Sequence, residues 1–414
     1  MLHEPRTGSL LVIFLTVFID LLGFGIVLPL VPIYAADFAE DPHGWRLGLL
    51  MASFSIMQFV FAPVWGRISD HWGRRPVLIV GLLGSVVFYT LFGVATVRKS
   101  LALLFVSRIG AGVSGATIAT AQAYIADSTS LEKRPKGMAL IGMAFGLGFT
   151  FGPLVAYLAV PSGHGDPGPW PGYAAAILSA LAVLLAVFKL PESKHAHSKS
   201  AARPIWDWRT FHEALTVPSI GLLLAAVFVC VFSFATYETT LSMLVKGSDA
   251  AAKMPFHFSF RQVCLTYAYI GLMLALVQGG IVRRLAGSVS EASLSIGGAV
   301  IETMGYGLMV AAVLQQSMGL VLGAATLVVG GFAMMHPSLN SLLSRRSDPQ
   351  KQGAIMGLGQ SVSALARILG SGVGIPLLRL RLDMPYYVSA FLMIVGLIVL
   401  SSAARRGGDY ARGL

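Results

Sequence analysis

Five ionisable residues lie within long apolar stretches of the chain. They are Asp20, Arg108, Glu238, Glu302 and Arg367. A charge at the centre of a membrane-spanning helix costs about 2.5–3.5 kcal/mol on insertion scales, so it persists where it faces water, a ligand or an opposite charge. We therefore expect these five residues to bind or exchange protons, or to control a neighbour that does.

Asp20 precedes a stretch that favours a break in a helix. Pro29 and Pro32 remove backbone donors, and Gly23 and Gly25 allow another helix to approach closely. A carboxylate beside such a break could carry a proton. The alternative is a structural carboxylate that is hydrogen-bonded to another helix.

Arg108 keeps its positive charge, so it needs a partner or water. Gly110, Gly112 and Gly115 follow it and would let a neighbouring helix pass close to the guanidinium. Arg108 could control a nearby acid so that proton release and substrate binding compete. The alternative is a static salt bridge.

The remaining ionisable residues lie in the second half of the chain. Glu238 stands among threonines and could bind a cationic group or shuttle a proton, or it could be solvated near the outer end of its helix. Glu302 could pair with Arg367. His336 is more often a hydrogen-bonded packing residue than a functional one.

A group of polar side chains inside apolar segments is predicted to bind substrate. It comprises Gln58, Gln122, Glu238, Gln278, Asn340 and Gln360. The amide side chains could equally form hydrogen bonds between helices.

The sequence shows no nucleotide-binding loop, no nucleophile–base pair and no metal cluster. His195 and His197 alone would make a weak metal site. We therefore expect neither an enzyme nor a bound cofactor or metal.

The elements that carry these residues are predicted to be membrane-spanning helices. Hydrophobic residues make up 55% of the 414 residues and charged residues 12%, against about 25% charged in soluble domains. Twelve apolar segments are long enough to span a bilayer. They are 10–35, 46–66, 76–97, 101–124, 137–160, 172–190, 217–245, 262–282, 290–313, 319–343, 353–377 and 385–403.

One long polar stretch, 191–216, interrupts this series after the sixth segment. It predicts two six-helix bundles, 1–190 and 217–414, joined by a cytoplasmic linker. The expected fold class is an all-α membrane protein built from two similar halves.

The distribution of basic residues tests this topology. With the N-terminus inside, the predicted inner segments hold 20 of the 30 Lys and Arg residues and the outer segments hold 8; the other two are Arg108 and Arg367. This asymmetry is typical of membrane proteins whose two termini are both cytoplasmic. It also accounts for the formal charge of +11 without a nucleic-acid partner.

A basic turn follows the second apolar segment. It reads Gly66-x-x-x-Asp70-x-x-Gly73-Arg74-Arg75. Gly73 permits a tight turn. Asp70 could pair with an arginine or act on the positive N-terminus of a helix.

With this turn, the chain resembles the major facilitator superfamily, and in particular its drug:proton antiporters of the tetracycline-resistance type. Three further patterns carry the resemblance: Asp20-x-x-Gly23-x-Gly25-x-x-x-Pro29-x-x-Pro32, Arg108-x-x-x-Gly112 and Gly148-x-x-x-Gly152-Pro153. Ala111 stands where the family has a glutamine, and Ala156 and Tyr157 replace a glycine pair. The second half lacks an aspartate that corresponds to Asp70.

The resemblance implies roles for these residues. Asp20 and Arg108 would belong to proton coupling, and Gly148, Gly152 and Pro153 would shape the interface between halves. Asp70 would latch against the start of the eleventh span, near Gln352 and Gly353.

We expect a proton-coupled antiporter that exports a small, partly apolar, drug-like compound by alternating access. Its partners would be that substrate, protons and the lipid bilayer of a bacterial inner membrane, and the resemblance implies a monomer. Two alternatives stay open: a proton symporter or uniporter for a nutrient or metabolite, and a receptor without transport on a transporter scaffold.

Overall fold

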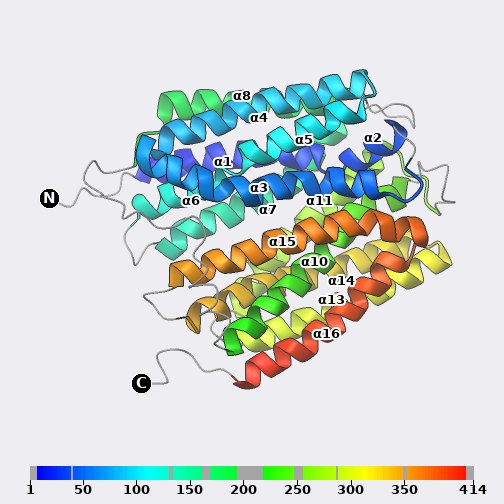
Figure 1. Ribbon diagram of the computed structural model, residues 1–414. Helices are drawn as coiled ribbons and strands as arrows, with labels where there is room; N and C mark the ends of the chain where they lie inside the picture. Colours follow the sequence, from blue (N-terminus) through cyan, green and yellow to red (C-terminus); the bar gives the residue numbers. More distant parts are fainter. Residues whose placement is uncertain are drawn as a thin grey trace. The chain divides into compact units, whose positions relative to one another are not determined.

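The computed structural model describes residues 7–38, 41–129, 134–160, 168–193, 218–246, 255–285, 288–347 and 352–406. These residues form long helices (Figure 1). The helices are α1 (Thr7–Val27), α2 (Val31–Phe38), α3 (Trp45–Trp72), α4 (Arg74–Val97), α5 (Leu101–Gly115), α6 (Ile118–Asp127), α7 (Arg134–Ala159), α8 (Trp170–Lys189), α10 (Pro218–Lys246), α11 (Phe260–Leu276), the π-helix η1 (Val277–Val282), α12 (Arg283–Leu285), α13 (Glu291–Gln315), α14 (Met318–Arg345), α15 (Gln352–Leu380) and α16 (Met384–Arg406).

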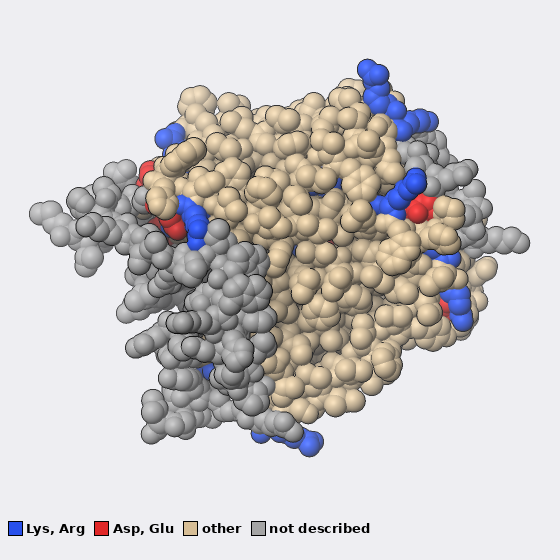
Figure 2. Space-filling model, in the orientation of Figure 1, with Lys and Arg blue, Asp and Glu red and all other residues tan. Residues whose placement is uncertain are grey.

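Twelve of these helices or consecutive helix groups are long and apolar enough to cross a membrane. The predicted number of spans and the all-α fold class are therefore confirmed. The charged side chains lie where membrane-spanning helices are expected to carry them. In Figure 2, the visible Lys, Arg, Asp and Glu lie mostly near the helix ends, and a broad surface of other residues separates them.

Three spans are interrupted. The first changes from α1 to α2 at residues 28–30, where Pro29 and Pro32 remove backbone donors, as the sequence predicts. The fourth changes from α5 to α6 at residues 116–117, directly after a glycine-rich turn. The eighth passes into η1, a π-helix, at Gln278, Gly279 and Gly280.

The second span is longer than predicted. Helix α3 continues to Trp72, so most of the motif from Gly66 onwards is helical and only Gly73 makes the turn into α4. Gly73 has a φ of 104°, which a residue with a side chain rarely adopts. The apolar segment ends at residue 66. The helix continues for further residues with polar side chains, which lie beyond the apolar segment.

The described helices group into two compact units. Unit 1 comprises Met1–Glu40, Ser53–Ile205 and Phe258–Leu272, and unit 2 comprises Asp41–Ala52, Trp206–His257 and Met273–Leu414. Each unit takes most of one predicted half and a short helical segment from the other. Most of the predicted linker lies outside the described residues, so the division into 1–190, 191–216 and 217–414 stays a prediction.

Unit 1 is held together by close contacts of α1 with α7 and α8, and of α4 with α5 and α8. Figure 1 shows α4 beside α8. In lipid, helix association depends on backbone approach and hydrogen bonds more than on the hydrophobic effect. A Cβ at Gly25 would lie 2.5 Å from the carbonyl oxygen of Gly148, so α1 and α7 approach at backbone distance.

Unit 2 is built around three close helix pairs. Helix α13 packs along α14, and α10 packs against α15 and α16. A Cβ at Gly331 of α14 would lie 2.5 Å from the backbone nitrogen of Glu302 on α13. This carboxylate therefore lies in the most closely packed part of the unit.

Candidate functional site

Asp20 lies on α1 where two other helices approach. A Cβ at Gly23, one turn further on, would lie 3.2 Å from the Tyr89 ring of α4 and 3.5 Å from Ser179 Oγ of α8. The same approach places the hydroxyls of Ser85 and Ser179 next to the Asp20 carboxylate. Asp20 Oδ1 is buried and has no hydrogen-bond partner among the described residues, although the residue as a whole is half-buried.

Arg108 on α5 is 2% exposed and makes no ion pair within the described part of the chain. Its guanidinium lies 4.6 Å from the centroid of the Phe54 ring, and its Nε and Nη1 lack hydrogen-bond acceptors among the described residues. Gly112 makes this possible, because a Cβ there would lie 2.5 Å from the carbonyl oxygen of Phe54. The expected close pass of a helix beside Arg108 is thus confirmed.

Tyr89 links the two charged residues. Its hydroxyl is in electrostatic range of both Asp20 and Arg108, and its side chain is 4% exposed. The alternative of a static salt bridge for Arg108 finds no acidic partner among the described residues. Unit 1 therefore contains a carboxylate and a guanidinium inside its spans that both lie within electrostatic range of Tyr89 and form no ion pair with each other.

In unit 2, three ionisable residues from three helices converge. Arg367 of α15 is the charged neighbour of Glu238 on α10 and of His336 on α14. Gly370 sets this arrangement, because a Cβ there would lie 2.5 Å from the carbonyl oxygen of Phe232 and so α15 lies against α10.

An aromatic stack adjoins this group. The rings of Phe234 and Phe332 are 3.9 Å apart between centroids with an interplanar angle of 16°. The imidazole of His336 continues the stack at 5.2 Å from Phe332, at 12°. His336 is therefore the packing residue that the sequence favours, and it also lies beside a charge.

The predicted pairing of Glu302 with Arg367 is wrong. Glu302 is 0% exposed, and its Oε1 accepts a hydrogen bond of 2.8 Å from the hydroxyl of Tyr306. Its Oε2 has no hydrogen-bond partner among the described residues. The close packing of α13 against α14 separates this carboxyl from the accessible face that carries Arg367.

The predicted substrate-binding amides are spread over both units. Gln58 on α3 donates to the carbonyl oxygen of Gly115 at 3.4 Å, so it joins two helices as the alternative interpretation proposes. Gln122 on α6 is half-buried. In unit 2, Gln278 lies in η1, Asn340 is half-buried one turn after His336, and Gln360 is exposed on α15.

The basic motif forms an ionic network around Arg74. Its guanidinium lies 2.6 Å from Asp70 and 3.0 Å from Asp127 of α6, and it donates to Ser69 Oγ at 2.6 Å. Asp70 therefore pairs with an arginine, one of its two predicted roles. The predicted latch to the eleventh span stays a prediction, because only the helical backbone of Gln352 and Gly353 is described.

The N-terminus of α4 has a different acceptor, which the sequence analysis missed. Glu192 accepts hydrogen bonds from the backbone N–H groups of Arg74 at 2.9 Å and Arg75 at 3.1 Å. A Cβ at Gly73 would lie 2.5 Å from Glu192 Oε2. The signal was present in the sequence, because Glu192 is an isolated acid directly after a span in an otherwise basic region.

The remaining motif residues lie on α7. Gly148 and Gly152 face Leu21 and Gly25 of α1, and Pro153 lies inside the helix. The described contacts of these glycines are thus within unit 1. Their predicted role between halves stays a prediction.

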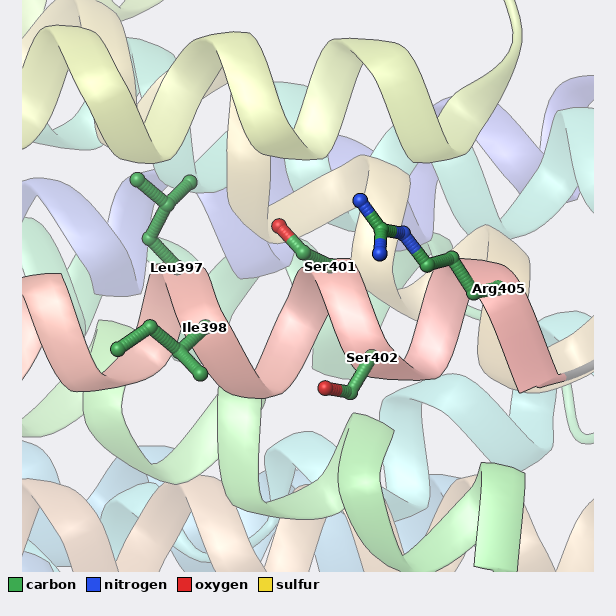
Figure 3. Close-up of a pocket in the computed structure, with 5 residues that line it drawn as sticks. All are labelled: Leu397, Ile398, Ser401, Ser402 and Arg405. Atoms are coloured by element: carbon green, nitrogen blue, oxygen red, sulfur yellow. The ribbon is translucent and has the colours of Figure 1, made fainter.

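A shallow surface depression of about 310 Å³ lies on α16. Its lining is Leu397, Ile398, Ser401, Ser402 and Arg405, all from one helix (Figure 3). It brings together no polar groups from different elements, so it has none of the features expected of a specific site.

Comparisons with known proteins agree with this architecture. A model of the Major Facilitator Superfamily matches residues 13–371. The chain is 32% identical over 369 residues to the class C tetracycline resistance protein of Escherichia coli, and the match covers 88% of each chain.

Two solved structures extend the likeness. The human organic anion transporter MFSD10 has a TM-score of 0.71 and 25% identity, with 96% of this chain and 99% of that chain covered. A D-xylose-proton symporter has a TM-score of 0.73 and 17% identity, with 96% and 97% covered, which shows a likeness of fold alone. This chain is therefore a multi-pass membrane protein of the Major Facilitator Superfamily.

Proposed function

We propose that this protein is a proton-coupled antiporter that exports a small amphipathic organic compound. The observation that carries the proposal is the unpaired arrangement of Asp20 and Arg108 in unit 1. An isolated carboxylate and an isolated guanidinium inside a span are both costly, and function is the usual reason for their presence. The likeness to a tetracycline resistance protein supports export.

Asp20 is the proposed proton carrier. Its carboxylate lies next to the hydroxyls of Ser85 and Ser179, which can exchange hydrogen bonds with it as its proton comes and goes. Tyr89 would couple Asp20 to Arg108, because its hydroxyl lies within electrostatic range of both side chains. Proton binding and substrate binding would then alternate as the two halves change their orientation.

The proposed location is a bacterial inner membrane, with both termini in the cytoplasm. The excess of Lys and Arg in the predicted inner segments supports this orientation. The Asp70–Arg74–Asp127 network and the Glu192 cap would then lie at the cytoplasmic ends of the helices. We propose a monomer as the working unit.

A flux experiment tests the proposal. The protein is reconstituted into liposomes with a pH dye inside, and tetracycline, other lipophilic drugs and sugars are added outside in turn. Antiport makes the interior alkaline as substrate enters, symport makes it acidic, and uniport moves radiolabelled substrate without a pH change.

Protein-free liposomes and the Asp20→Asn variant are the controls, because a permeant weak base changes the internal pH without any protein. Alkalinisation that needs both the protein and Asp20 supports the proposal. Acidification, or flux that is equal in Asp20→Asn, would contradict it. No movement of any compound would favour a receptor on a transporter scaffold.

A further inference from the structure

The accessible face of α15 in unit 2 carries a cation that forms no ion pair with a described residue. Arg367 lies near the middle of the span Ile355–Leu380 and is exposed, whereas Ala366 is buried and Gly370 lies against α10. Arg367 makes no hydrogen bond or ion pair with any described residue. A guanidinium at this depth needs water or an anion, so the face that it occupies is not a lipid-facing one.

The neighbours of Arg367 leave its charge open to a ligand. Glu238 is near enough to interact electrostatically, but no ion pair joins the two side chains. Glu238 is half-buried and Arg367 is exposed, so the positive charge is the more accessible of the two to an approaching ligand. A cationic ligand that approached Glu238 would be repelled by the positive charge of Arg367.

Flat apolar surface lies next to this cation. Phe234 and Glu238 are one helical turn apart on α10, and Phe332 and His336 are one turn apart on α14. The stack of Phe234, Phe332 and His336 holds three nearly parallel rings, and its His336 end lies within electrostatic range of the Arg367 guanidinium. All three residues are half-buried, so part of each ring remains accessible.

We propose that this group, which comprises Arg367, Phe234, Phe332 and His336, binds the anionic end of a planar aromatic compound. Arg367 donates two parallel hydrogen bonds to a carboxylate or a similar planar anion. The rings of the stack contact the aromatic part of the same compound. The substrate class of the proposed antiporter is therefore a planar aromatic anion or zwitterion, and this inference rests on the proposed function.

Matched ligands test this inference. Benzoate, 2-naphthoate and 2-anthroate are compared with their uncharged amides. They are also compared with the methylammonium compounds, in which a CH₂–NH₃⁺ group replaces the carboxylate on the same ring system. The thermal unfolding midpoint of the purified protein in detergent, measured against ligand concentration, gives each Kd. The carboxylate is expected to bind about tenfold or more tightly than its amide, in the range that a hydrogen bond to a charged group provides, and the methylammonium compound more weakly than the amide.

Three variants assign the effect. Arg367→Met should remove the preference for the carboxylate, and Arg367→Lys should keep part of it. Phe332→Leu, which conserves much of the volume, should reduce the gain from larger rings and leave the preference for the carboxylate. Arg405→Met is the matched control, because it removes a positive charge from α16 away from this group, and it should bind all ligands as the wild type does.

Several outcomes overturn the inference. One is that no carboxylate binds more tightly than its amide at any ring size; another is that the methylammonium compounds bind best, or that the preference survives in Arg367→Met. If another compound moves protons in liposomes while these results are obtained, the proposed function stands without this inference. If carboxylates bind through Arg367 but no compound moves protons, the inference stands and the proposed function fails.

Discussion

The two units differ in the exposure and in the partners of the charged residues inside their spans. In unit 1, Asp20 and Arg108 form no ion pair with each other, and Tyr89 lies within electrostatic range of both. In unit 2, Glu302 is 0% exposed and accepts a hydrogen bond from Tyr306, while Arg367 is exposed on a different face. A charged residue inside a span can therefore have several roles, and its exposure and its partners distinguish them.

This comparison suggests a division of roles. A residue that exchanges a proton in each cycle needs partners that can change, and Asp20 lies next to two hydroxyls in a half-buried position. Glu302 has one hydrogen-bond partner and no exposed surface, which suits a structural carboxyl. Arg367 is exposed and forms no ion pair with a described residue, which suits a ligand site.

The largest expected effect is that of Asp20→Asn. Asparagine keeps the size and the hydrogen bonds of the side chain but carries no exchangeable charge. Substrate-driven proton flux in liposomes should fall by about 100-fold, in the range found when a positioned proton-transfer group is removed. Binding of 2-naphthoate should remain within about threefold of the wild type, because the group around Arg367 is unchanged.

Gly25→Ala tests the contact that holds α1, and therefore Asp20, in place. The added Cβ would lie 2.5 Å from the carbonyl oxygen of Gly148, so the two helices must separate. We expect a loss of about 1–3 kcal/mol of stability, as for other overpacked sites, and reduced flux. Gly146→Ala on the same α7 is the control, because nothing lies within 4 Å of a Cβ there; equal unfolding temperatures for the two variants would contradict the account.

Glu192→Gln should have a smaller effect. The change removes the negative charge that accepts hydrogen bonds from two backbone N–H groups at the start of α4. Because Glu192 is exposed, we expect a loss of only about 0.5–1 kcal/mol, measured by thermal unfolding in detergent. The loss should shrink at high salt; a loss that does not depend on salt would mean that packing of this side chain matters more than its charge.

Glu302→Gln should have the smallest effect on transport. Glutamine keeps an oxygen that can accept the hydrogen bond from Tyr306, and it fills the same space between α13 and α14. Proton-coupled flux should stay within about twofold of the wild type, since no group that exchanges protons is removed. If flux instead falls as far as in Asp20→Asn, Glu302 is a second proton carrier, as its place among the five intramembrane charges first suggested.

Much of the fold could be predicted from the sequence, because long apolar segments and the spacing of basic residues are direct consequences of the bilayer. The break after α1 followed from Pro29 and Pro32 in the same way. The extension of α3 to Trp72 was missed, because apolarity marks where a helix leaves the membrane and not where it ends.

The candidate site was only partly predictable. Asp20, Arg108, Glu238 and Arg367 stood out because charges are rare inside spans. Their partners could not be found in this way, because Tyr89, Ser179 and Phe332 are ordinary residues of apolar helices. They acquire their roles through close approaches between helices that are far apart in the sequence.

The predicted pairing of Glu302 with Arg367 was wrong for a related reason. Opposite charges in two spans suggest a salt bridge, but the sequence does not show which faces of the helices meet. The hydrogen bond from Tyr306, four residues further along the same helix, follows from helical spacing alone, whereas a pairing with Arg367 requires two particular helix faces to meet.

Proton release on substrate binding is the sharpest test of Asp20 as the proton carrier. The compound with the largest flux is added to the purified protein in weakly buffered detergent solution, and the pH is recorded for the wild type, Asp20→Asn and Glu302→Gln. We expect binding to release protons from the wild type and from Glu302→Gln, and none from Asp20→Asn, which still binds the compound. Proton uptake on binding, or release that persists in Asp20→Asn, would contradict this role of Asp20.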